Sequence, residues 1–176
     1  MRAATADAHH ALDRRFADGL PDRQSYTVYV LGMQRLLAAF ESAAAAGAAP
    51  FELAPWHGTV RAPLLDADLD ALGASPLAPA TVHLDDAGEW FGAQYVVEGS
   101  ALGARTLLDS LQAAGAARPA ETAFLQRHTR PDPGWREFLA RLETRPHTEV
   151  PAMIAGALRM FALAEDSFAR AEDTAR

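Results

Sequence analysis

The chain of 176 residues has room for one hydrophobic core, and we expect one domain that spans residues 1–176. With 49% apolar and 22% charged residues it has the composition of a folded globular protein, and its net charge of -7 argues against nucleic acid as a partner. The chain has no cysteine, which excludes disulfides and thiolate metal sites, and no apolar run of the ~20 residues that a membrane span needs. We therefore expect a cytoplasmic protein with no membrane partner.

Apolar residues recur every three or four positions through most of the chain, which is the period of a helix with one buried face. The first two helices are predicted over residues 2–17 and 25–46, with Ser25 as the N-cap of the second. Residues 51–61 contain proline and glycine, and they are predicted to form a loop around a half-buried Trp56.

The rest of the chain continues this helical pattern. Gly73 stops an acidic helix over residues 64–72, and Asp85 or Asp86 caps a long helix that reaches residue 114. No stretch alternates apolar and polar residues over the length of a strand, so the predicted fold class is an all-α, multi-helical bundle. The remaining predicted elements are helices over 121–126, 135–143 and 150–172 and a proline-rich loop that ends at Gly134.

Two neighbouring histidines lie in the first predicted helix. His9 follows Thr5 by four positions and precedes Leu12 by three, so it shares their inward face, whereas His10 is turned away by about 100°. A neutral imidazole on such a face can ligate iron, and its second ring nitrogen then usually has a hydrogen-bond acceptor nearby. A histidine held by hydrogen bonds in the core would produce the same pattern.

The long helix carries Gly92, Gly99 and Gly103, whose offsets of seven and four place them on one side. Each glycine inside a helix costs roughly 0.5–1 kcal/mol relative to alanine, so three on one face indicate that something approaches the backbone closely. Either a neighbouring helix or a flat ligand would meet this requirement. Glycines also permit a kink, which would bend the helix over a planar ligand.

Two segments of the sequence together resemble segments of the heme oxygenase family. Ala4-Thr5-Ala-Asp-Ala-His9 is similar to the proximal segment of that family. Tyr95-Val-Val-Glu98-Gly99-Ser-Ala-Leu-Gly103-Ala-Arg105 is similar to the distal segment, above all in the bacterial branch associated with bacteriophytochromes. The resemblance implies one heme oxygenase-like domain, in which heme is sandwiched between the N-terminal proximal helix and a kinked, glycine-rich distal helix.

The resemblance also implies roles for individual residues. His9 would ligate the heme iron, Gly99 and Gly103 would flank bound O2, and Ser100 would order the water chain that delivers protons. Ser100 replaces the aspartate of animal heme oxygenases, and Ala104 replaces a second glycine, where its methyl group would lie near the heme edge. The other predicted heme contacts are Thr5, Phe161 and two arginines that would face the propionates, Arg2 and Arg136.

The implied reaction is the oxidative cleavage of heme, which is both substrate and cofactor, to biliverdin, carbon monoxide and ferrous iron. The chain has no flavin or nicotinamide motif, so a ferredoxin or a reductase would supply the electrons, and a bilin-accepting phytochrome is a further candidate partner. Two alternatives stay open. One alternative is a heme carrier or sensor of the same fold, which the replacement of glycine by Ala104 suggests. The other is a helical protein whose glycine face packs against a partner helix.

Four further histidines have no helical partner four positions away that would form a metal-binding pair. They lie in predicted loops or connectors, and we expect all of them at the surface. They are His57, His83, His128 and His147.

Overall fold

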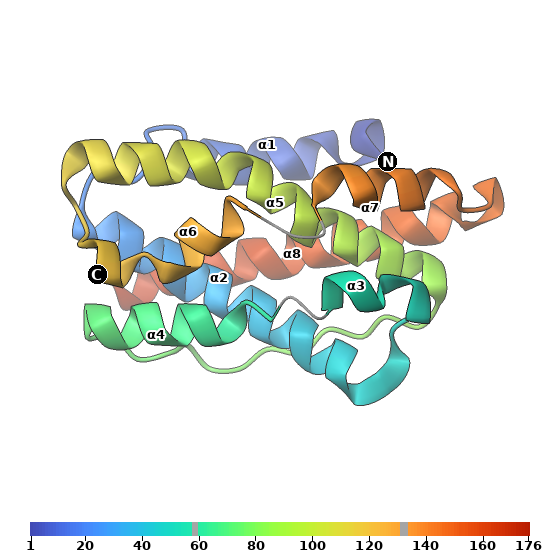
Figure 1. Cartoon of the computed structure of the whole chain (residues 1–176), viewed down its shortest axis with the longest axis horizontal. Helices are drawn as coiled ribbons and strands as arrows, with labels where there is room; N and C mark the ends of the chain where they lie inside the picture. The colour runs from blue at the N-terminus through green and yellow to red at the C-terminus, as the bar shows by residue number, and fades with distance from the viewer. Residues whose placement is uncertain (58–59, 131–133) are drawn as a thin grey trace.

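The computed structural model describes residues 1–57, 60–130 and 134–176, and over these ranges all regular structure is helical. The all-α prediction is therefore confirmed. Figure 1 shows α2 and α8 through the middle of the bundle, α1 and α7 along one side and α4 along the other. No helix in the described part of the chain is long and apolar enough to cross a membrane. The main helices are α1 (Ala6–Arg15), α2 (Arg23–Ala43), α4 (Ala62–Leu72), α5 (Ala87–Ala114), α7 (Trp135–Glu143) and α8 (Val150–Thr174).

The ends of α4 and α5 follow from their capping residues. The carboxylate of Asp86 accepts a hydrogen bond from the backbone N–H of Glu89 at 3.0 Å, which caps the start of α5. Gly73 and Gly115 end α4 and α5 with φ angles of 72° and 60°, in the left-handed region that favours glycine. These boundaries were predicted correctly.

The first two helices differ from the prediction. Residues Arg2–Thr5 form a short 3-10 helix, η1, so the α-helix begins only at Ala6. The N-cap of α2 is Asp22 and not Ser25, because Asp22 accepts a hydrogen bond from the backbone N–H of Ser25 at 2.7 Å. Ser25 returns the bond by accepting from the backbone N–H of Asp22 at 3.2 Å. Beyond Ala43, α2 continues as a π-helical segment, η2 (Ala44–Ala48).

Several shorter segments also differ from the prediction. The predicted loop over 51–61 contains two short helices, and Trp56 is 5% exposed, which makes it fully buried and not half-buried. Part of that loop, residues 58–59, and part of the proline-rich loop, residues 131–133, lie outside the described residues. The additional short elements are η3 (Phe51–Leu53), α3 (Ala54–His57), η4 (Pro119–Glu121), α6 (Ala123–His128) and η5 (His147–Glu149).

The backbones of α5 and α8 approach each other closely where the two helices cross. A Cβ atom added at Gly92 would lie 1.9 Å from the carbonyl oxygen of Met153, and one added at Gly156 would lie 2.1 Å from that of Glu89. Both positions therefore require glycine, since the two backbones touch there. The neighbour that Gly92 accommodates is therefore a helix, which is one of the two neighbours expected for the glycine face.

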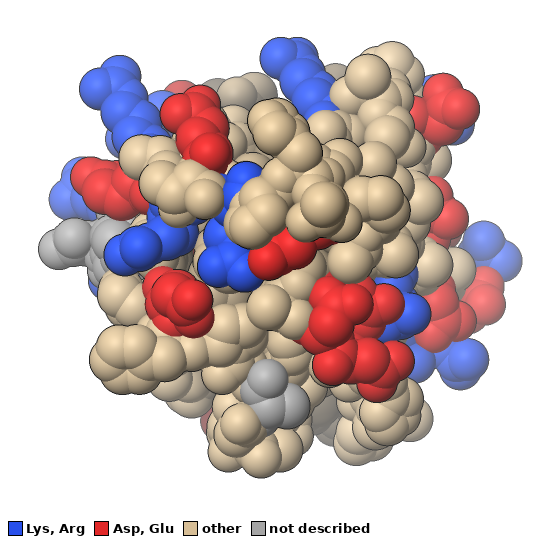
Figure 2. Space-filling view, turned by 90° about the vertical axis from the view of Figure 1, so that its right-hand side faces the viewer, with Lys and Arg blue, Asp and Glu red and all other residues tan. Residues whose placement is uncertain are grey.

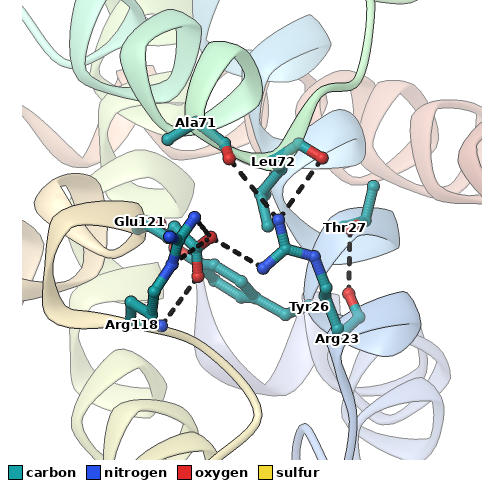
Figure 3. A network of polar contacts seen from close by, with 7 residues as sticks. All are labelled: Arg23, Tyr26, Thr27, Ala71, Leu72, Arg118 and Glu121. Carbon is teal, nitrogen blue, oxygen red and sulfur yellow. Dashed lines mark hydrogen bonds and ion pairs between the residues drawn. The ribbon is translucent and has the colours of Figure 1, made fainter.

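A buried polar network anchors the beginning of α6, as Figure 3 shows in part. The Tyr26 hydroxyl donates to the carbonyl oxygen of Glu121 at 2.8 Å, and the Glu121 carboxylate accepts from Arg118 at 2.6 Å and from Arg23 at 2.7 Å. Asp68, from α4, accepts from the first two backbone N–H groups of α6 at 2.8 and 3.0 Å. The network joins α2, α4 and α6, so it determines where α6 lies.

Surface charge is mixed at the end of the molecule that Figure 2 presents. Among the described residues visible there, both arginine and acidic side chains occur, and neither sign covers the whole face. Exposed ion pairs such as Arg170–Asp166, at 3.0 Å, occur elsewhere on the surface, and each contributes at most about 1 kcal/mol.

Candidate functional site

Two neighbouring cavities lie between α1 and α5. The smaller, of about 280 Å³, is bounded by α1, α2, α5 and α8, and the larger, of about 580 Å³, is bounded by η1, α1, α5 and α7. His9, Asp13 and Gly99 line both cavities, so the two meet at these residues. Sites for small molecules commonly enclose roughly 300–1,000 Å³, so the space between α1 and α5 is large enough for a cofactor-sized ligand.

On the α1 side, His9 is half-buried and faces the cavities. Its ring centroid lies 4.7 Å from that of Phe161, with the planes inclined at 61°, and Phe161 itself lines the smaller cavity. His10 is exposed and lines only the larger cavity. Asp13 follows His9 by one helical turn and shares both cavities with it, so its carboxylate lies on the same helix face.

On the α5 side, Gly99 and Gly103 expose their backbone to the smaller cavity. A Cβ atom added at Gly103 would meet no described atom within 4 Å, and one added at Gly99 would lie 3.7 Å from the ring of Trp135. These glycines are therefore not needed for helix packing, in contrast to Gly92. Figure 1 shows that α5 bends partway along its length, although it is one continuous α-helix.

Ser100 lines the smaller cavity and has two hydrogen-bonding neighbours. Its hydroxyl oxygen lies 2.7 Å from the carbonyl oxygen of Val97 and 2.9 Å from Nε2 of His128. His128 is 2% exposed, and its ring stacks on that of Phe124 with centroids 4.8 Å apart. Burial, followed by the nearby charges of Arg61 and Arg127, lowers the pKa of His128 to about 3.

The prediction that all four remaining histidines lie at the surface was wrong for His128 and for His57, which is half-buried. His83 and His147 are exposed as expected. His128 ends α6, and the network around Tyr26 and Asp68 ties the start of that helix to α2 and α4. Its burial depends on contacts between distant segments, so no local signal in the sequence indicated it.

Behind α5, away from the cavities, Glu98 forms a buried ion pair. One of its carboxylate oxygens accepts from Nη2 of Arg61 at 2.7 Å and from Nε2 of Gln94 at 2.8 Å. The side chains of Arg61 and Glu98 are 4% and 0% exposed. Because removal of one partner of such a pair leaves an uncompensated charge, the pair ties the segment before α4 to α5. Sequence reasoning did not identify Arg61.

The structure brings together only part of the predicted site. His9, Gly99, Ser100, Gly103 and Phe161 line the smaller cavity, and the exposed Arg2 lines the larger one. Three other predicted residues are not among the described residues that line either cavity. They are Thr5, Ala104 and Arg136.

Each of these three residues has a different environment. Thr5 is buried, and its hydroxyl oxygen lies 3.3 and 3.4 Å from the carbonyl oxygens of Met1 and Arg2. Ala104 is fully buried in the hydrophobic core, so its methyl group does not narrow the cavities. Arg136 is exposed on α7.

Several aromatic residues that line the cavities were not predicted as site residues, and Tyr29 and Trp135 are two of them. Tyr29, from α2, lines the smaller cavity, and burial raises the pKa of its hydroxyl group. Trp135, the first residue of α7, lines the larger cavity with its ring centroid 5.2 Å from that of Tyr95. Aromatic residues at helical spacing usually belong to the core, and the sequence does not distinguish a core position from a cavity position.

The fold and site define an all-helical protein with a ligand cleft between a histidine on one helix and exposed glycine backbone on another. An imidazole, a mostly apolar lining and glycine backbone fit a flat ligand that carries a metal, as heme does. No family model matches the chain. It is 31% identical over 147 residues to a heme oxygenase of Xanthomonas campestris pv. campestris (strain 8004), a match that covers 80% of this chain and 87% of that protein. The chain belongs to the heme oxygenase family.

Proposed function

We propose that this protein is a heme oxygenase, which cleaves heme to biliverdin, carbon monoxide and ferrous iron. The observation that carries the proposal is that His9 of α1 and the open backbone at Gly99 and Gly103 of α5 line one cavity. Heme would be the substrate, and its iron would supply the site at which dioxygen reacts. Electrons would come from a ferredoxin or a separate reductase.

Residues of α1 would bind and orient the heme. The imidazole of His9 would ligate the iron, and the ring of Phe161, at 4.7 Å, would restrict its rotation. The carboxylate of Asp13, one turn along the same face, would accept a hydrogen bond from the second ring nitrogen. Arg2, which lines the larger cavity, would pair with a propionate, and the exposed Arg136 is the second candidate for that role.

Residues of α5 would form the opposite wall. Gly99 and Gly103 have no side chain to keep the macrocycle and a small gas molecule away from the helix backbone. The hydroxyl group of Ser100 lines the same cavity and can hold a water molecule there. These residues would exclude bulk water and position the protons that the reaction consumes.

The single domain over residues 1–176 and the cytoplasm as location follow from chain length and composition. The branch associated with bacteriophytochromes and a phytochrome as recipient of the bilin follow from the resemblance. A heme carrier or sensor was the alternative that Ala104 suggested. Because Ala104 lies in the core, no observation favours that alternative.

Hemin titration of the purified protein tests the heme site. We expect a stoichiometric complex with a sharp Soret band, and we expect His9→Ala to shift that band because the iron loses its protein ligand. His10→Ala is the matched control, since His10 is exposed and lines only the larger cavity. If hemin forms no stoichiometric complex with the wild-type protein, the assignment of heme is wrong.

A single-turnover experiment tests the reaction itself. The heme complex is reduced under air with ascorbate or with ferredoxin and its reductase, and the absorption spectrum is followed. We expect the Soret band to decay while the absorption of a bilin rises at the red end of the spectrum. A fully loaded complex whose Soret band does not change would contradict the enzymatic proposal and support a carrier.

A further inference from the structure

The contact between the half-buried Ser100 and the buried His128 determines which hydrogen-bonding group faces the cavity. A serine hydroxyl has one hydrogen to donate and two lone pairs to accept with. The carbonyl oxygen of Val97, 2.7 Å away, can only accept, so it takes the hydrogen of Ser100. Nε2 of His128, 2.9 Å away, must then carry a hydrogen and donate it to Ser100.

The other ring nitrogen of His128 agrees with this assignment. Nδ1 is buried and has no hydrogen-bond partner among the described residues. In the tautomer with hydrogen on Nε2, Nδ1 is a bare lone pair, whereas the opposite tautomer would bury an N–H group without an acceptor. Among backbone groups, a buried N–H without an acceptor is rarer than a buried acceptor without a donor. The low pKa keeps the ring neutral, so only one nitrogen carries hydrogen.

We propose that His128 is a positioning residue that donates from Nε2 to Ser100, so that Ser100 presents a lone pair to the cavity. Ser100 then accepts a hydrogen bond from a donor in the cavity, which we take to be a water molecule. A water held in this way directs its second hydrogen toward the heme face. The role in the reaction rests on the proposed function, whereas the hydrogen-bonding state of the pair does not.

The structure holds His128 in place from two sides. Its ring stacks on Phe124 with an interplanar angle of 21°, and the backbone N–H of Phe124 donates to Asp68 at 3.0 Å. Asp68 also accepts from the N–H of Ala123, so both first residues of α6 are fixed to α4. The backbone of α6 is therefore fixed, and the His128 ring can leave Ser100 only by losing its stacking on Phe124.

The hydrogen-bonding state is tested on the heme-free protein. Nitrogen-15 chemical shifts of the His128 ring, measured by NMR, identify the nitrogen that carries the hydrogen. We expect the Nε2–H tautomer in the wild-type protein and a changed Nε2 shift in Ser100→Ala. The Nδ1–H tautomer in the wild-type protein would overturn the proposal, and so would a ring unaffected by Ser100→Ala.

The positioning role is tested by single turnover. His128→Phe keeps the ring that stacks on Phe124 but removes the donor, and we expect it to slow turnover roughly 10-fold with little change in hemin affinity. Ser100→Ala should slow it by a similar factor, and the double variant should be no slower than either single variant. His128→Gln, whose amide can donate, should recover part of the rate. His147→Phe, at an exposed histidine, is the control.

The outcomes separate the two proposals. Wild-type turnover in His128→Phe, or multiplied losses in the double variant, would overturn the positioning role while the heme oxygenase assignment stands. If the wild-type protein does not degrade heme, the proposed function fails, and the tautomer measurement still decides the state of the pair. If His128→Phe does not fold, the comparison of Ser100→Ala with the wild-type protein by NMR still decides it.

Discussion

Gly92 and Gly103 lie on the same helix but are needed for different reasons. An added methyl group at Gly103 would meet no described atom within 4 Å, so Gly103→Ala should stabilise the heme-free protein by about 0.5–1 kcal/mol through helix propensity. Because Gly103 lines the smaller cavity, we expect the added methyl group to take space from the ligand and weaken hemin binding. Urea unfolding measures the first effect, and hemin titration measures the second.

The matched variant Gly92→Ala should have the opposite effect on stability. Its methyl group would lie 1.9 Å from the carbonyl oxygen of Met153, which belongs to the backbone of α8 and cannot turn aside. We expect the free energy of unfolding to fall by about 1–3 kcal/mol, the usual cost of overpacking. Equal stabilities for the two alanine variants would show that the glycine face does not divide into a packing part and a cavity part.

Individual residues also show what the sequence could and could not predict. His9 was preferred over His10 by helical phase alone, and it is His9 that lines both cavities. The burial of His128 and the inward position of Ala104 depend on how α5 and α6 pack. Spacing within one helix carries no information about which face a distant segment covers, so these two placements were not predictable.

At the scale of elements, helix ends were predictable where a single residue decides them. Gly73, Asp86 and Gly115 each act through their own backbone conformation or side chain, and their helices end or begin as expected. The start of α6 differs because it is set by Asp68, more than fifty positions earlier in the chain. Boundaries of this kind follow from the fold and not from the local sequence.

The network that anchors α6 predicts a pH dependence of stability. Hydrogen bonds from Arg118, more than any other contact, lower the pKa of Glu121 from 4.5 to about 2. Because the pKa of the folded state is below that of the unfolded state, ionised Glu121 stabilises the fold above pH 4.5. This contribution is lost as the pH falls from 4.5 toward 2.

The variant Glu121→Gln tests this dependence. We expect it to be less stable than the wild-type protein at pH 7, and we expect the difference to shrink steadily as the pH is lowered below 4.5. Urea unfolding at a series of pH values measures both free energies. Asp109→Asn, at an exposed carboxylate on α5, is a control that should leave the wild-type pH profile unchanged. A difference between Glu121→Gln and wild type that is independent of pH would show that Glu121 acts only through packing.

At the scale of the whole molecule, α1 is the least supported of the main helices. None of its residues is buried, and it packs chiefly against α8. Its inward residues His9 and Leu12, and Phe16 directly after it, border the cavity that separates it from α5. Heme bound there would fill the space between the two helices. The ligand would then complete the hydrophobic surroundings of α1.

Heme should therefore stabilise the protein and protect α1 most of all. At a free hemin concentration one hundred times the dissociation constant, linkage predicts about 2.7 kcal/mol, which raises the thermal midpoint by roughly 5–10 °C. Hydrogen exchange should slow most at the amides of residues 6–15, whereas those of α4, on the far side of the bundle, should change little. His9→Ala should reduce both effects. Protection spread evenly over α1 and α4 would mean that hemin binds outside the cleft, because only a ligand between α1 and α5 replaces the contacts that α1 lacks.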